Sequence, residues 1–170
     1  MRSALALALV LALAVSTASW AGAAPADPAQ AWAPMHRFIG TWKGTRAGAE
    51  GPAKVTRVLS SSATNHHLEI MEKGGGLPRA AVRGMVSLDA ERQVLVLRQF
   101  ATDGSATEAA LDPAASTGDK LVFASPESEA ARLRITFERT GARSYLERIE
   151  RSEGGGTFEV VSETRFVRAD

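Results

Sequence analysis

The sequence predicts an all-β fold: an antiparallel, up-and-down β-barrel of about ten strands with a short N-terminal helical lid. After Gly40, short runs rich in β-branched and aromatic residues alternate with turn residues such as glycine, aspartate and serine. Beyond residue 41 no stretch keeps a helical period for more than one or two turns. Ten strands in one open sheet would leave long hydrophobic edges, which closure into a barrel removes. A sandwich of two sheets is the competing arrangement.

The N-terminal residues have the pattern of a secretory signal peptide. A basic start is followed by an apolar run over residues 4–15 and by the small residues Ala21-Gly22-Ala23. The run is too short for a membrane-spanning helix, which needs about 20 apolar residues. We therefore expect residues 1–23 to be removed and the protein to be exported, either periplasmic or secreted.

The composition limits the partners of the exported chain. The full chain of 170 residues contains no cysteine, so its core must hold together without disulfides. Its formal net charge is +1, and Arg2 is the only charged residue of the leader, so the processed chain is formally neutral. A neutral chain with scattered arginines gives no electrostatic reason to expect nucleic acid or an anionic membrane as a partner.

The folded part is expected to be one domain over residues 34–170, preceded by a flexible arm rich in alanine and proline at 24–33. Met35, Phe38 and Ile39 share one helical face, which predicts a short helix over 34–39.

Ten strands are expected to follow the helix. They span residues 41–46, 53–60, 66–72, 81–88, 93–100, 106–111, 120–124, 133–139, 144–150 and 158–168. Alternation indicates the face that is buried. In the tenth strand the inward face would hold Phe158, Val160, Ser162, Thr164 and Phe166.

The start of the first strand resembles a known group of barrels. Gly40-Thr41-Trp42 matches the Gly-x-Trp motif of calycin-type barrels, which include lipocalins, fatty-acid-binding proteins and nitrobindin-like barrels. The resemblance implies that Trp42 closes one end of the barrel and packs under a basic side chain from the last strand. Arg165 and Arg168 are the candidates for that side chain.

The resemblance extends over essentially the whole processed chain to a bacterial exported family of unknown function. The segments that carry it are Gly51-Pro52-Ala53 with Arg57, residues 100–104, and the ending Glu-Thr-Arg-Phe-Val-Arg at 163–168. It implies a lipocalin-like fold and does not identify a ligand.

The histidines do not form a metal site by this reading. His66 and His67 are adjacent in a strand and point to opposite faces, and His36 lies in the N-terminal segment. Nitrobindin-like barrels bind haem through a histidine late in the chain, but no histidine follows His67. We predict neither a metal nor another cofactor.

Charged residues at inward positions are the best candidates for a site. Arg57 lies between inward apolar residues of the second strand, and Glu147 follows Tyr145 on the inward face of the ninth. Buried charges must be paired or must meet a ligand. They could form a structural pair, Arg57 could await a ligand carboxylate, or the positions could be open to water at a barrel end. Arg98 on the fifth strand is a further candidate.

The leading functional hypothesis is an exported, non-enzymatic protein that binds a small apolar or amphipathic ligand inside the barrel. The alternative is a cell-envelope protein that binds or inhibits another protein with its outer surface, its barrel being filled by side chains. A third possibility is a barrel enzyme that uses Tyr145 and Glu147 as an acid–base pair, which no sequence motif supports.

Overall fold

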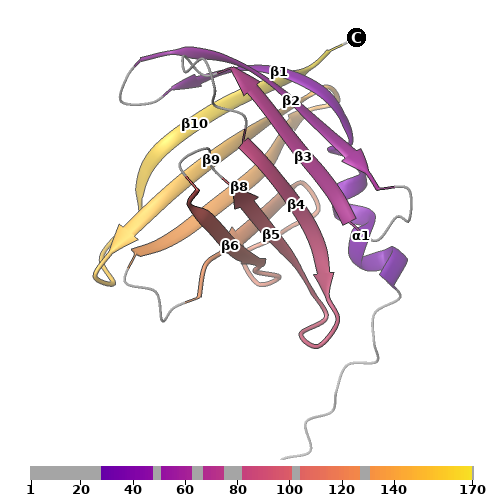
Figure 1. Cartoon of the computed structure of the whole chain (residues 1–170), viewed down its shortest axis with the longest axis vertical. Coiled ribbons are helices and arrows are strands. Elements are labelled where there is room, and N and C mark those ends of the chain that lie inside the picture. The colour runs from indigo at the N-terminus through magenta and orange to yellow at the C-terminus, as the bar shows by residue number, and fades with distance from the viewer. Residues whose placement is uncertain are drawn as a thin grey trace, which may run out of the picture.

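The computed structural model confirms the ten-stranded barrel. It describes residues 28–47, 51–62, 67–74, 82–100, 104–126 and 131–169, so the predicted signal peptide and His66 lie outside the described residues. The strands are β1 (Gly40–Ala47), β2 (Ala53–Ser61), β3 (His67–Gly74), β4 (Val82–Asp89), β5 (Val94–Phe100), β6 (Ala106–Leu111), β7 (Lys120–Ala124), β8 (Ala131–Gly141), β9 (Ser144–Glu153) and β10 (Glu159–Arg168). Each strand pairs antiparallel with its neighbours in sequence, and β1 also pairs with β10, which closes the sheet (Figure 1). The closure excludes the two-sheet sandwich.

The helix differs from the expectation in its position. Helix α1 spans Pro28–His36, so it begins inside the segment 24–33 that was expected to be a flexible arm, and it ends before the expected limit at residue 39. The physical reason is burial, because Trp32 and Met35 lie three residues apart and are 6% and 0% exposed. Pro28 stands at the first helical position, where proline is well tolerated, and Pro34 is accommodated inside the helix.

Helix α1 closes one end of the barrel. In Figure 1 it lies beside the end of β2 and the start of β3. Met35 and Phe38 belong to the same buried cluster as the inward residues of the strands. Within the part of the chain that the structure describes, no helix has the length and apolar character needed to cross a membrane.

The Gly-x-Trp segment builds this closed end. Trp42 is 3% exposed and donates a hydrogen bond of 2.7 Å from its indole nitrogen to the carbonyl of Phe38. The guanidinium of Arg168 lies 5.2 Å from the Trp42 ring centroid and donates to the carbonyl of Ile39 at 2.8 Å. Gly40 has a φ of +138°, which other residues rarely adopt, and a Cβ there would lie 2.8 Å from Arg168 Nη2, so a larger residue would be strained and would displace this arginine.

Arg165, the other candidate for the cover of Trp42, is exposed on the outer face of β10. It lies three residues before Arg168. Because successive side chains of a strand point to opposite faces, residues an odd number of positions apart lie on opposite faces. The basic residue at the closed end is therefore Arg168 and not Arg165.

The predicted inward face of β10 was wrong at its start, because the strand contains a β-bulge. The register with β9 shifts between Val160 and Ser162, so Val160 lies opposite Glu150 while Ser162 lies opposite Ile149. Because the bulge inserts one extra residue, the residues before it point to the face opposite to the one that simple alternation predicts. Val160 is 56% exposed, and the Phe158 ring lies 4.3 Å from the Arg134 guanidinium carbon instead of inside the barrel.

The packing of α1 gives a first testable expectation. Met35→Ala removes a fully buried side chain from the closed end and should lower the free energy of unfolding by about 2–5 kcal/mol. Ala33→Lys, at an exposed position of the same helix, is the matched control and should change it by about 0.5 kcal/mol or less. Urea unfolding followed by circular dichroism measures both. Equal, small effects would show that α1 does not pack on the barrel.

Candidate functional site

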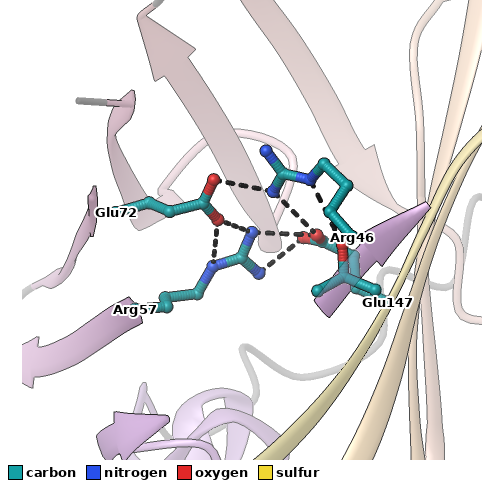
Figure 2. A network of polar contacts seen from close by, with 5 residues as sticks. Arg46, Arg57, Glu72 and Glu147 are labelled. Carbon is teal, nitrogen blue, oxygen red and sulfur yellow. Dashed lines mark hydrogen bonds and ion pairs between the residues drawn. The ribbon is translucent and has the colours of Figure 1, made fainter. Parts of the chain in front are cut away.

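The inward charges meet in one buried network inside the barrel (Figure 2). Arg57 of β2 is 2% exposed and contacts two carboxylates, those of Glu72 on β3 and Glu147 on β9. Its Nη1 and Nη2 atoms donate to the two oxygens of Glu147 at 2.6 and 2.8 Å. Its Nε and Nη2 atoms donate to one oxygen of Glu72 at 3.0 and 2.5 Å.

A second arginine completes the network. Arg46 of β1 places its Nη2 atom 2.7 Å from Glu72 and 3.9 Å from Glu147, and its Nε donates to the hydroxyl of Thr164 at 3.2 Å. Its side chain is 25% exposed, whereas both carboxylate side chains are at most 2% exposed. Two arginines and two glutamates leave the network with no net formal charge.

Strand alternation explains how these residues meet. Arg57 lies between Val55 and Leu59 on the inward face of β2, and Glu72 is its direct partner across the strand pair β2–β3. Glu147 lies two residues beyond Tyr145 on the inward face of β9. The sequence placed Arg57, Tyr145 and Glu147 inward, and the structure puts Arg57 and Glu147 in direct contact.

The charges of the network balance one another without a ligand. Burial alone would lower the pKa of Arg57, but the attraction of the carboxylates, mainly Glu147, raises this pKa well above its ordinary value. These hydrogen bonds use four of the five N–H groups of Arg57. Arg57 is therefore not a vacant anchor for a ligand carboxylate.

Aromatic rings separate the network from the closed end. The Arg57 guanidinium lies 4.6 Å from the Phe166 ring centroid, and Phe166 stacks on Tyr145 with 4.8 Å between centroids. The Tyr145 ring meets Trp42 edge-on at 4.8 Å. The hydroxyl of Tyr145 has no hydrogen-bond partner of ordinary geometry among the described residues, although Arg57 is close enough to affect its titration.

Acid–base chemistry by Tyr145 and Glu147 does not fit this arrangement. Burial raises the pKa of Tyr145 well above 10.0, and the nearby charge of Arg57 only partly opposes the rise. Both carboxylate oxygens of Glu147 are engaged by Arg57. A phenol that resists ionisation and a fully paired carboxylate make a poor catalytic pair at neutral pH.

A pocket of about 230 Å³, partly open to solvent and called the cavity below, adjoins the network. Its walls are formed by Arg46, Arg57, Glu72, Gln99, Ile149 and Ser162. Ser162, just after the bulge in β10, shares the inward face with Thr164, and its buried hydroxyl oxygen has no partner within the described ranges. Buried polar groups are normally hydrogen-bonded, so this hydroxyl calls for a water or a ligand.

The remaining candidate, Arg98, lies elsewhere. It points outward from β5, where its Nε donates to Glu108 at 2.8 Å and its Nη1 to the Ser87 hydroxyl at 2.9 Å. The neighbouring residue, Gln99, is the one that faces the cavity. The expectation that Arg98 belongs to the interior site was wrong.

The histidines of the described chain give no metal centre. His67 is on the outer face of β3, 3.6 Å from Glu69, and His36 is exposed on α1. In the ranges that the structure describes, no three His, Cys, Asp or Glu side chains gather as a metal ion would require.

Sequence reasoning missed Glu72, Arg46, Gln99 and Ser162. Glu72 shares the inward face of β3 with Leu68 and Ile70, so the alternation that identified Arg57 could have found it. Arg46 is likewise on the face of Trp42. Ser162 was placed inward, but nothing in the sequence showed that its hydroxyl would lack a partner.

Comparisons with known proteins identify the fold alone. No family model and no curated protein matches the chain. Rv2717c from M. tuberculosis is similar in structure, with a TM-score of 0.58 and 13% identity over 85% of this chain and 100% of that one. The S-type phycobiliprotein lyase CPES from Guillardia theta aligns with a TM-score of 0.48 and 9% identity, over 79% of this chain and 90% of that one. The chain is thus a ten-stranded antiparallel β-barrel with solved structural neighbours.

The network gives a sharp stability prediction. Arg57→Met leaves two buried carboxylates without their main partner and should cost about 3–5 kcal/mol of unfolding free energy. Arg98→Met breaks an ion pair whose side chains are 36% and 47% exposed, and it should cost about 1 kcal/mol or less. Chemical denaturation of both variants gives the comparison. Similar losses in the two would mean that the interior network does not hold the fold.

Tyr145 gives a prediction for alkaline pH. Because the pKa of Tyr145 is raised in the fold, its contribution to the free energy of unfolding is complete below pH 10.0, the ordinary pKa. This contribution is lost as the pH rises above that value. It is the only tyrosine of the chain, so the ultraviolet absorbance of tyrosinate reports on it alone. Native protein should show no ionisation near pH 10.0, whereas protein in denaturant should titrate there. A native titration near the ordinary value would contradict the burial of the hydroxyl.

Proposed function

We propose that the protein binds a small, uncharged amphipathic molecule in the partly open pocket on the inner face of its barrel. The observation that carries the proposal is the cavity of about 230 Å³, whose wall includes the hydroxyl of Ser162, a group without a partner among the described residues. Ile149 supplies apolar wall, and Gln99 supplies an amide that can donate or accept. An apolar side chain thus lies beside polar groups that can fix the orientation of a small molecule.

The charge balance determines the class of ligand. The four charged groups beside the cavity neutralise one another, and four of the five N–H groups of Arg57 already bind carboxylates. A carboxylate or ammonium ligand would find no unpaired group of opposite charge among the described residues that line the pocket, so its loss of hydration would be only partly offset. A hydroxyl or carbonyl group can bind Ser162 and Gln99 without that cost. The volume is below the roughly 300–1,000 Å³ of drug-sized sites, so the ligand is small.

The biological setting belongs to the same proposal. The signal-peptide pattern of residues 1–23 supports export to a periplasm or the medium. The Gly-x-Trp start with its arginine cover supports kinship with calycin-type barrels. We therefore propose a non-enzymatic, exported carrier or scavenger.

The proposal predicts a ranking of three probes of similar shape. Hexanol should bind and raise the melting temperature, whereas hexanoate and hexylammonium should bind at least about tenfold more weakly, because burying their unpaired charge is costly. Calorimetry and thermal unfolding on the processed protein measure the series. Native mass spectrometry of freshly purified protein tests for a co-purified small molecule.

Ser162→Phe is the matched variant, since it fills the cavity and removes the hydroxyl. It should abolish hexanol binding while the protein stays folded by circular dichroism. Arg98→Gln, on the outer face, is the control and should leave hexanol binding unchanged. Hexanol binding that survives Ser162→Phe, or preferential binding of hexanoate, would refute the proposal.

A further inference from the structure

A second feature lies on the outside of the barrel and does not involve the cavity. Lys43 of β1, Lys54 of β2 and Arg165 of β10 are exposed on the outer face of three adjacent strands. They surround a hollow of about 550 Å³, whose walls also include Thr45 and Val167. We call this feature, defined by the three cations, the cationic groove.

The strand register fixes the spacing of the three charges. Thr45 of β1 lies opposite Arg165 on one side and opposite Lys54 on the other, so these three residues form one row across the strands. Strands lie about 4.8 Å apart, which places the backbones of Arg165 and Lys54 roughly 10 Å from each other. Lys43 stands two residues along β1 from Thr45 on the same face, between the two outer cations. The charges form a compact triangle.

Among the described residues, none of the three cations is neutralised by a neighbour. In the part of the chain that the structure describes, no acidic group lies within ion-pair distance of Lys43, Lys54 or Arg165. Glu163, two residues before Arg165 on the same face, is already paired with Arg148 at 3.1 Å.

Other arginines on the outer face do have acidic partners. Arg98 pairs with Glu108, and Arg134 pairs with Glu150 through two hydrogen bonds. The whole chain carries a formal charge of only +1, so the positive potential of the groove is local and does not follow from the overall charge.

We propose that the cationic groove docks an extended, acidic segment of a partner protein. Charge complementarity selects an anionic partner. Alternate side chains of an extended peptide repeat about every 6.6 Å, which matches the distance along β1 between Lys43 and Thr45. The hydroxyls of Thr45 and Thr56 can bond the peptide groups, and Val167, which is 53% exposed, offers an apolar contact.

The test measures binding of a fluorescently labelled peptide of ten glutamates to the processed protein by anisotropy. Binding should weaken as salt is raised, because the contact is electrostatic. The triple variant Lys43→Gln, Lys54→Gln, Arg165→Gln should bind at least about tenfold more weakly. The matched control, Arg83→Gln, Arg92→Gln, Arg151→Gln, removes the same charge elsewhere on the surface and should bind within about twofold of wild type.

Three outcomes would overturn the inference. Equal losses in the two triple variants would show that only net charge matters. Groove-dependent binding to vesicles of equal phosphatidylglycerol and phosphatidylcholine, without peptide binding, would identify a membrane surface instead. Absence of peptide binding to wild type at low salt would leave the groove without this role. Hexanol binding in the groove variant, an independent readout of the cavity, separates a failure here from a failure of the proposed function.

Discussion

The fold depends on how the buried guanidinium of Arg57 is satisfied. A charge that is 2% exposed is tolerated only when its donors meet acceptors in good geometry. Glu72 comes from the adjacent strand and Glu147 from β9, which is separated from β2 by β1 and β10, so the contact joins segments far apart in sequence. A slip of one residue between β2 and β3 would turn Glu72 outward and leave Arg57 short of a partner. The network thus specifies register as well as contributing energy.

The same network divides the interior into two regions. On one side, Trp42, Tyr145 and Phe166 pack with the residues of α1 into an apolar, aromatic plug. On the other side lies the cavity, with Ser162 and Gln99 on its wall. Phe166 joins the two regions, because one face of its ring stacks on Tyr145 and Arg57 lies over the ring. The space available to a ligand begins where the aromatic packing ends.

Much of the fold could be predicted because the strands alternate clearly. Arg57 and Glu147 were placed inward by their apolar neighbours, and the tenth strand was assigned correctly from Ser162 onward. The bulge before Ser162 could not be predicted, since an inserted residue leaves no mark in a pattern of period two. Val160 was misplaced for that reason.

Other features were hidden for different reasons. The fifth strand reads Val-Leu-Val-Leu before Arg98, so apolar residues occupy both faces and alternation cannot say which way the arginine points. Helix α1 contains two prolines, which obscure it in the sequence. It is stabilised by the burial of Trp32 against the barrel, a contact that the local sequence does not reveal. The cavity and the cationic groove arise from contacts between strands, which no single segment of sequence encodes.

The seam between β1 and β10 has a consequence for how the chain folds. Trp42, near the start of the described chain, pairs across the seam with Arg168, near its end. The barrel therefore cannot close until the last strand has been synthesised and, if the chain is exported as expected, has crossed the membrane. Until then β1 offers an unpaired edge, and the arginine that covers Trp42 is missing. Pairings of such long sequence separation make folding slow and place the closing of the barrel among its last events.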